Sequence, residues 1–288
     1  MKTYPSDLTA EQFALIEINL PILQPHPRRI WDYYIIFNAI LYVVKGGIQW
    51  RMLPDSFPPW GTVYGYFRTW CKSGLWEELN TFLREQVRVA HGKDPQPSAA
   101  ILDSQSAKTT EQGGERGYDG GEKVNGRKRF IVTDTLGLLL LVKVIAANTR
   151  EPVGGELILE GANTRFPKIR ILWVDKRPCP KRPKPARCIF GVKKVRFMVK
   201  KGFREDHFHV WVEGVLQWDF QVTKGRGKPG QPGFVVEARR WVVERTFAWL
   251  LQCRRLSRDF ERLSMTTEAM IFACMTRLMM RRLVRMSS

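Results

Sequence analysis

Apolar positions over residues 1–91 recur at the spacing of three and four residues that is typical of amphipathic helices. Ser6-Asp7-Leu8-Thr9 provides a cap for the first helix, and Gly46-Gly47 ends a strongly apolar one. The later helices carry aromatic and arginine side chains. This pattern fits a helix-turn-helix-like DNA-binding domain or a small helical bundle packed on the main domain, and taken alone it favours the bundle. The predicted helices cover 6–20, 30–44, 62–71 and 75–90.

From residue 99 onward the pattern changes to short apolar runs that are typical of buried strands, with a hairpin-like turn at 134–137. The first run stops at Asp103, and a later run stops at Asp175. Helices are predicted between and after these runs, over 156–162, 239–251 and 265–284. This order of elements predicts an α/β core with a mixed sheet. The predicted strands cover 99–102, 130–133, 138–146, 168–174 and the aromatic stretch 203–222.

These changes divide the chain into a helical region at 1–91, a linker at 92–98 and an α/β domain at 99–288. Within the last, the segment 176–233 is atypical. Its first part, 176–201, holds eleven Lys and Arg residues and no acid, and its prolines make it extended. It is either a solvated loop or a segment that lies along a phosphate backbone, and the absence of any acid favours the second interpretation.

The balance of charge is strongly basic, with 47 Lys and Arg against 28 Asp and Glu, a net charge of +19. Such a surplus indicates a polyanionic partner, nucleic acid before an anionic membrane. The sequence contains no run of 18 apolar residues, the length needed to span a bilayer. The amino terminus lacks the apolar core of a signal peptide. Five scattered cysteines without a CxxC pair argue against zinc and disulfides. We therefore expect a cytoplasmic, nucleoid-associated protein with reduced thiols.

The helix predicted over 239–251 carries one acid, Glu244, among several arginines. By spacing, Glu244 shares the inner stripe with Trp241, Phe247 and Ala248, where an unpaired carboxylate would be costly. It is either one half of a structural ion pair or a metal-binding carboxylate beside a phosphate-binding surface.

Three carboxylates are expected to converge on one edge of the sheet. Asp103 and Asp175 each follow an apolar strand, and Glu244 lies on a later helix. Ligand sites of α/β proteins collect at such strand ends. Three carboxylates repel one another unless cations neutralise them, and hard oxygen ligands suit Mg²⁺ or Mn²⁺. Two such ions, ~3.5–4 Å apart, can activate an attacking hydroxyl and stabilise the leaving oxygen of a phosphodiester.

Several stretches resemble bacterial insertion-sequence transposases of the DDE class, in the insertion sequence five group. Together they cover residues 4–150 and 234–284 almost continuously and in order. The stretches that carry the resemblance are Ser6-Asp7-Leu8-Thr9, Gly47-Ile48-Gln49-Trp50-Arg51-Met52-Leu53-Pro54, 60–70, Ala99-Ala100-Ile101-Leu102-Asp103-Ser104-Gln105-Ser106, Arg116-Gly117-Tyr118-Asp119-Gly120-Gly121, Gly126-Arg127-Lys128-Arg129, Asp134-Thr135-Leu136-Gly137-Leu138 and 240–250.

The resemblance implies an RNase H-like catalytic core, a Mg²⁺-dependent carboxylate triad and an amino-terminal domain that helps to bind the inverted repeats of the element. Asp103 matches the first aspartate, Asp175 the second and Glu244 the glutamate, while Arg240 matches the arginine of the family's helix signature. The expected partner is double-stranded DNA, with a homo-oligomer on paired ends and no membrane. The basic residues expected to contact DNA are Arg51, Arg68, Arg127, Lys128, Arg129, Arg240, Arg245, Arg254 and Arg255. For Arg240 and Arg245, the alternative role is to orient Glu244.

The sequence departs from the family at the second aspartate. Where the family usually reads Ala-Asp-Gly-Gly-Tyr, this chain reads Val174-Asp175-Lys176-Arg177-Pro178, and Asp206 and Asp219 are alternative second aspartates. Three functions are therefore open. The first is a transposase that nicks the element's end and transfers the freed 3′-hydroxyl to target DNA. The second is a catalytically inactive DNA-binding protein of the same descent, and the third is an RNA-binding protein held by charge alone.

Overall fold

The computed structural model describes residues 3–17, 30–111, 113–174, 206–222 and 240–287. Its centre is a six-stranded mixed sheet. β1 (Ala99–Lys108) lies in the middle, antiparallel to β3 (Val124–Thr133) and parallel to β5 (Ile171–Val174). β4 (Leu139–Ala146) extends the sheet beyond β3, and β6 (Asp219–Val222) extends it beyond β5. The short β2 (Gly117–Asp119) pairs with the first residues of β3. The mixed sheet expected from the sequence is thus confirmed.

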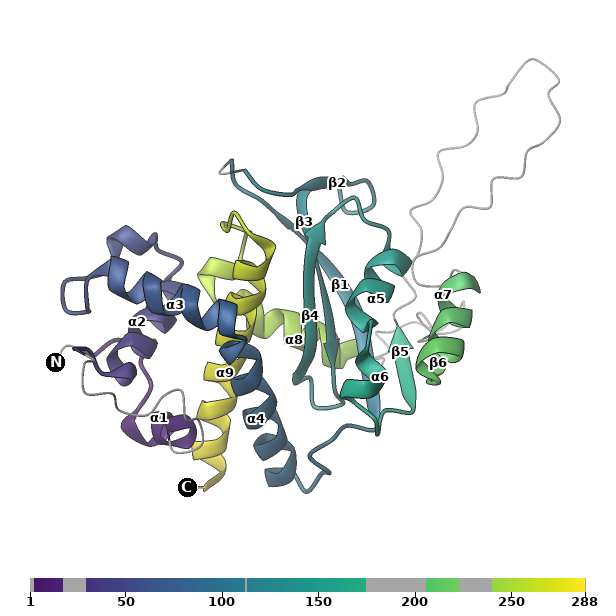
Figure 1. Cartoon of the computed structure of the whole chain (residues 1–288), viewed down its shortest axis with the longest axis horizontal. Coiled ribbons are helices and arrows are strands. Elements are labelled where there is room, and N and C mark those ends of the chain that lie inside the picture. The colour runs from purple at the N-terminus through teal and green to yellow at the C-terminus, as the bar shows by residue number, and fades with distance from the viewer. Residues whose placement is uncertain (1–2, 18–29, 112, 175–205, 223–239, 288) are drawn as a thin grey trace, which may run out of the picture.

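Helices cover both faces of this sheet (Figure 1). On one face, α5 (Glu151–Leu159), α6 (Ala162–Arg165), α7 (Asp206–Trp211) and the π-helical turn η4 (Val212–Leu216) share a core with alternate residues of the strands, such as Leu102 and Phe130. On the other face, Ile101 and Ile131 pack in a second core with α4 (Leu75–Ala90), α8 (Arg240–Leu251) and α9 (Ser264–Ser287). Because successive side chains of a strand point to opposite faces, β1 and β3 contribute to both cores.

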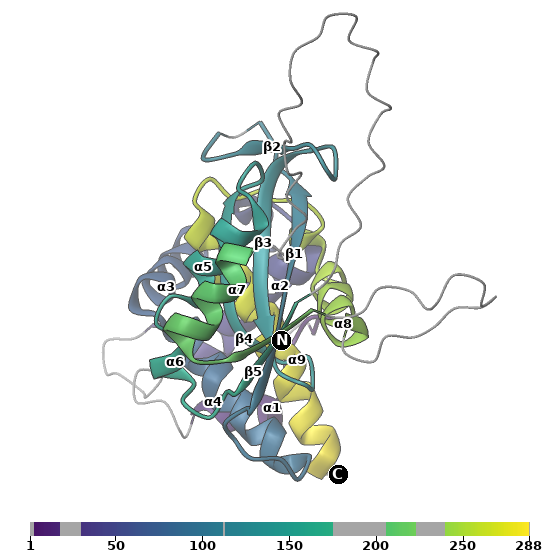
Figure 2. The same ribbon diagram turned by 90° about the vertical axis from the view of Figure 1, so that its right-hand side faces the viewer.

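The amino-terminal helices gather around α9 (Figures 1 and 2). They are α1 (Ala10–Glu17), α2 (Tyr33–Gly46), the 3-10 turn η2 (Trp50–Met52), α3 (Trp60–Ser73) and α4. Phe37, Phe67, Trp70 and Trp76 are buried between them, and this aromatic cluster is continuous with the core that α9 shares with the sheet. The helices therefore pack on the main domain as the bundle interpretation expects. The boundaries at 1–91, 92–98 and 99–288 remain a prediction.

Local signals set several helix ends. Asp32 precedes α2 and accepts a hydrogen bond from the backbone N–H of Tyr34 at 2.9 Å, which satisfies one of the first-turn donors. Gly47 ends the same helix in the left-handed region, with φ 71°. A Cβ at this position would lie 2.8 Å from Cβ of Arg254, so glycine also permits the close approach of α2 to the 3-10 turn η5 (Arg254–Leu256).

Three expectations about the elements were wrong. β1 does not stop at Asp103 but runs to Lys108, because the residues that follow continue the antiparallel ladder with β3. Within the predicted strand 203–222, residues 206–216 are helical, and among the residues described there only 219–222 form a strand. The helix predicted over 156–162 begins earlier, at Glu151. In the described parts of the chain, no helix is long and apolar enough to cross a membrane.

Candidate active site

Asp103 lies inside β1, opposite Ile131 of β3, and only 7% of its side chain is exposed. The alternation of the strand places it on the same face as Ile101, two residues earlier, and therefore on the face that α8 covers. The backbone N–H of Ser104 donates to Asp103 Oδ1 at 2.7 Å. The carboxylate is thus held on the α8 side of the central strand.

Asp103 also lies level with the carboxyl end of β5. Leu102 pairs with Val174, the last residue of β5, so Asp103 is the next residue along β1. Asp175, the expected second aspartate, lies outside the described residues. The alternative Asp206 begins α7, but its side chain is not described. Asp219 pairs with Ile171 at the amino end of β5, three residues and roughly 10 Å along the strand from Val174. Asp219 therefore lies away from Asp103.

The helix α8 carries Glu244 across the sheet face that contains Asp103. Val243, Phe247 and Leu250 are buried in the core beside Ile101, and this packing holds α8 against β1. Glu244 itself is exposed. The expectation that it shares the inner stripe with Trp241 and Ala248 was wrong, because both of those residues are exposed too.

The donor chemistry of this face suits a hard divalent cation. Asp103 and Glu244 offer carboxylate oxygens from a strand and from the helix packed on it, which is the ligand type that Mg²⁺ and Mn²⁺ prefer. Among the residues that the structure describes, no three His, Cys, Asp or Glu side chains form a metal-binding group. The described part of the chain thus brings the strand that carries Asp103 and the helix that carries Glu244 together on one face of the sheet.

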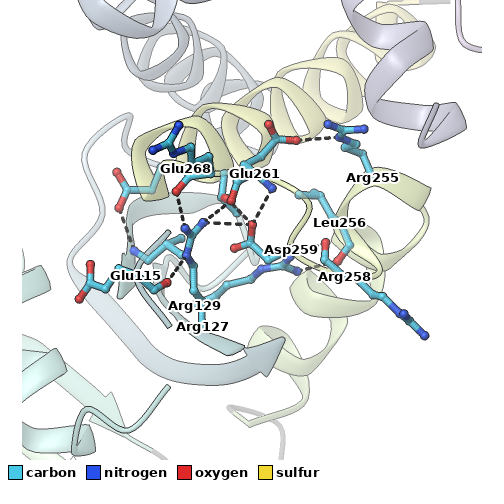
Figure 3. Close-up of polar contacts among 12 residues, drawn as sticks. Glu115, Arg127, Arg129, Arg255, Leu256, Arg258, Asp259, Glu261 and Glu268 are labelled. Carbon is cyan, nitrogen blue, oxygen red and sulfur yellow. Dashed lines mark hydrogen bonds and ion pairs between the residues drawn. The ribbon is translucent and has the colours of Figure 1, made fainter. Parts of the chain in front are cut away.

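Four of the basic residues expected to contact DNA are instead buried. Arg127, Lys128 and Arg129 alternate along β3, and Arg255 lies in η5, each with at most 8% of its surface exposed. Figure 3 shows Arg127 and Arg129 turned toward the chain just before α9. Arg127 donates to the carbonyl oxygens of Glu115, Glu261 and Arg262, and it pairs with Asp259 at 3.2 Å.

Arg129 and Arg255 have similar structural roles. Arg129 donates to the carbonyl oxygens of Leu256 at 2.6 Å and Arg258 at 3.1 Å. Burial lowers the pKa of Arg129, although the charge of Asp259 partly opposes this shift. Arg255 pairs with Glu261 at 2.7 Å (Figure 3). It also donates to the carbonyl oxygen of Ile48. Side chains enclosed in this way cannot reach a phosphate, so their expected role in DNA contact is corrected to one in the fold.

Lys128 points to the opposite face of the sheet and forms a separate polar cluster. Its Nζ lies 3.0 Å from Asp119 Oδ2, and Ser106 Oγ donates to the same oxygen at 2.6 Å. The backbone N–H groups of Gly121 and Glu122 donate to Asp119 Oδ1. The stretch Gly117-Tyr118-Asp119-Gly120-Gly121 is therefore tied to β1 and β3 by the aspartate at its centre.

The remaining basic residues differ in exposure. Arg51, Arg68 and Arg254 are exposed. Arg51 lies over the ring of Trp60 at 5.2 Å, and Arg68 lies over Tyr64 at 6.0 Å. Arg245 is half-buried beside Glu244, and Arg240 begins α8 with a side chain that is not described.

Two buried aspartates were missed by the sequence reasoning. Asp134 and Asp259 have 0% and 1% of their surface exposed, and each is paired with a buried arginine. Asp134 lies in the hairpin turn that the sequence predicts, but its partner Arg88 is 46 residues away. Asp259 lies between η5 and α9, where the sequence pattern carried no signal for it.

Three family models match the chain, one after another. Residues 8–80 match a model described as "Putative transposase of IS4/5 family". Residues 94–184 and 197–281 each match a model described as "Transposase DDE domain". Comparisons with curated proteins and with solved structures found no match.

The sheet order and these matches together define the class of protein. A central β1 with antiparallel neighbours on one side and parallel ones on the other is the sheet of an RNase H-like core, as the DDE domain matches imply. The chain belongs to the DDE transposases, which are enzymes of the transposase and nuclease type. Its amino-terminal match assigns it, more narrowly, to the insertion-sequence transposases of the IS4/5 family.

Proposed function

We propose that this transposase cleaves DNA at the ends of its element in a reaction that depends on Mg²⁺ or Mn²⁺, and then joins the freed 3′-hydroxyl to target DNA. The observation that carries the proposal is the position of Asp103. Its carboxylate is held on the central strand, level with the end of β5, on the face that is covered by the helix carrying Glu244. Carboxylate oxygens in this position are ligands of the type that Mg²⁺ and Mn²⁺ prefer, and the DDE domain matches agree with this assignment.

Each carboxylate has a distinct task in this proposal. Asp103 presents its oxygens from a rigid strand, while Glu244 presents its oxygens from the solvent side of α8, where DNA can approach. Asp175 is proposed as the third ligand because it directly follows Val174, the partner of Leu102. Two divalent ions, when bound, supply activation of the attacking hydroxyl and charge neutralisation at the phosphodiester.

The proposed partner is double-stranded DNA, both the terminal inverted repeats and the target. A net charge of +19 gives the electrostatic attraction that sequence-independent binding requires. The exposed Arg51, Arg68 and Arg254 are proposed as phosphate contacts, with Arg240 at the start of α8. Action on paired ends would bring two copies of the chain together, and a cytoplasmic location at the nucleoid follows from the DNA substrate.

The test is a nicking assay on supercoiled plasmid that carries an element end, with and without divalent ions. Asp103→Asn, Asp175→Asn and Glu244→Gln should each abolish nicking and leave the affinity for end DNA nearly unchanged. Glu160→Gln is the matched control, because Glu160 is exposed on the opposite side of the sheet, at the end of α5. Nicking by the Asp103→Asn protein at the wild-type rate would contradict the proposal.

A second candidate is a DNA-binding protein of the same descent that lacks catalysis. It is favoured by Lys176 and Arg177, which stand where the family has two glycines directly after the second aspartate. This candidate predicts selective binding of end DNA without any metal-dependent nicking by the wild-type protein. Equal affinity for end DNA and for RNA would instead favour a protein that binds nucleic acid by charge alone.

A further inference from the structure

The turn between β3 and β4 lies against α8 and accepts hydrogen bonds from it. Arg245 Nη2 donates to the carbonyl oxygen of Leu136 at 2.9 Å, and Thr246 Oγ1 donates to that of Gly137 at 2.8 Å. Two consecutive residues of the helix thus bind two consecutive carbonyls of the turn, directly after Glu244 in the sequence. Contacts at two adjacent points fix both the rotation and the axial position of α8.

Buried hydrogen bonds and an ion pair hold the turn itself. Asp134, which is fully buried, accepts hydrogen bonds through Oδ1 from the backbone N–H groups of Leu136 at 2.9 Å and Leu138 at 2.8 Å. Its other oxygen, Oδ2, pairs with Arg88 Nη1 of α4 at 2.5 Å. Gly137 adopts φ 77°, and a Cβ there would lie 2.8 Å from Thr246 Oγ1. A buried ion pair and a glycine therefore shape the surface on which α8 rests.

Arg245 has its guanidinium enclosed by aromatic rings. It lies 4.2 Å from the ring centroid of Trp241 and 4.8 Å from that of Trp249, one helical turn to either side. Arg282 of α9 lies 4.1 Å from the ring of Trp249 and continues the stack. Burial lowers the pKa of Arg245, and the charge of Asp134 opposes that shift. A planar guanidinium suits this place because it can stack and donate in its own plane at once.

We infer that Arg245 and Thr246 are positioning residues for the reaction, which set the orientation of α8, and with it Glu244, relative to Asp103. The inference rests on the proposed function, since it concerns the same carboxylates. Of the two roles expected for Arg245, phosphate contact and orientation of Glu244, it favours the second, because the guanidinium lies between two rings and is bonded to the turn. Loss of these contacts lets α8 rotate, and a displacement of about 1 Å at a catalytic group can cost 10²-fold in rate.

Thr246→Val and Thr246→Ser form a matched pair for the first experiment. Valine keeps the shape and removes the hydroxyl that binds Gly137, whereas serine keeps the hydroxyl. Single-turnover nicking at saturating end DNA should fall by about tenfold to 10²-fold in the valine variant and recover in the serine variant. The dissociation constant for end DNA should remain within roughly twofold of wild type in both, because Thr246 is buried.

Arg245→Lys and Arg245→Gln separate positioning from phosphate contact. If Arg245 positions α8, both variants lose rate at saturating DNA, since lysine cannot stack and bond as guanidinium does. If Arg245 instead holds a phosphate, the glutamine variant binds DNA more weakly, its salt slope falls by roughly 0.9, and its rate at saturation is unchanged. The latter result would overturn the inference.

Hydrogen exchange of the α8 amides gives a readout that does not depend on nicking. Exchange over 242–251 should rise in Thr246→Val and stay at the wild-type level in Thr246→Ser. Thr69→Val, which removes an exposed threonine hydroxyl from α3, should leave α8 unchanged. Unchanged exchange in Thr246→Val, or faster exchange with an unchanged nicking rate, would overturn the inference. If the wild-type protein does not nick end DNA, the proposed function is wrong. The exchange data would still show whether the contact between the turn and α8 holds the helix in place.

Discussion

Arg127 and Asp259 form an ion pair 3.2 Å long in which neither side chain has any exposed surface. The pair joins β3, in the middle of the sheet, to the chain that leads into α9. Asp259 Oδ1 also accepts hydrogen bonds from Thr267 Oγ1 at 2.9 Å and from the backbone N–H of Glu261 at 3.1 Å. Arg127, which the sequence motif suggested as a DNA contact, thus links the sheet to the chain that leads into α9.

Replacing Asp259 by Asn should destabilise the protein by about 3–5 kcal/mol, because it leaves the charge of Arg127 buried and uncompensated. Urea unfolding followed by tryptophan fluorescence would measure the change. Arg116→Gln is the control, since Arg116 is exposed on the same side of the molecule and its loss should cost less than about 0.5 kcal/mol. Equal midpoints for wild type and Asp259→Asn would contradict the structural role of the pair.

Exposed and buried arginines should differ in their effect on DNA binding. Each phosphate contact that is lost lowers the salt slope of the binding constant by roughly 0.9. We therefore expect Arg51→Gln, Arg68→Gln and Arg254→Gln to reduce the slope without changing stability. Arg129→Gln, with 1% of the side chain exposed, should lower stability and leave the slope of the folded protein unchanged. Filter binding from low to high salt tests both expectations, and a smaller slope for Arg129→Gln alone would reverse the assignment.

Asp119 gives a prediction for the dependence of stability on pH. Burial raises the pKa of its carboxyl, but hydrogen bonds from Ser106 and Lys128 outweigh this effect and lower the pKa from 3.8 to about 2. The ionised group therefore stabilises the folded state above pH 4, and this contribution is lost as the pH falls through about 2. Asp119→Asn should be less stable than wild type at pH 7, and the two unfolding midpoints should converge between pH 4 and pH 2. A constant difference over this range would contradict the pairing.

The sequence predicted the type of most elements, because their apolar periods are regular. It failed where a strand remains a strand after its apolar run ends. The polar residues Ser104-Gln105-Ser106 suggested that the strand ends at Asp103. They continue β1, because β3 supplies their hydrogen-bonding partners. The prediction of a strand over 203–222 was wrong because its aromatic residues, such as Phe208 and Trp211, belong to a helix that packs against α5. For short apolar runs, the hydrophobic period alone cannot distinguish a strand from a buried helix.

The candidate site residues could be predicted from the sequence, but their arrangement in space could not. Asp103 and Glu244 follow from the residues and the resemblance, and the structure places their strand and helix on one face. Which arginines are exposed could not be predicted, because the burial of Arg127 and Arg129 depends on partners more than 120 residues away, such as Leu256 and Asp259. Long-range pairing of this kind leaves no local pattern in the sequence.

Cys253 and Cys274 should form a disulfide when the protein is oxidised, although the scattered cysteines suggested reduced thiols. Their sulfur atoms lie 3.0 Å apart, and both residues are buried. Cys253 lies between α8 and η5, and Cys274 lies within α9. The hydrogen bond from Cys274 lowers the pKa of Cys253, which favours the thiolate that attacks an oxidant. With diamide, the two thiols lose two hydrogens to the azo group and join as a disulfide.

The oxidised protein should show one linked peptide pair, 253 with 274, and resist unfolding by about 3 kcal/mol more than the reduced protein, as expected for a loop of this length. Cys71→Ser should behave like wild type, because Cys71 lies apart on α3, whereas Cys253→Ser and Cys274→Ser should each abolish the stabilisation. Because the bond would tie the end of the helix carrying Glu244 to α9, nicking should survive oxidation only if α8 already holds its active position in the reduced protein. Linkage that appears only after denaturation would show that the two thiols do not meet in the folded chain.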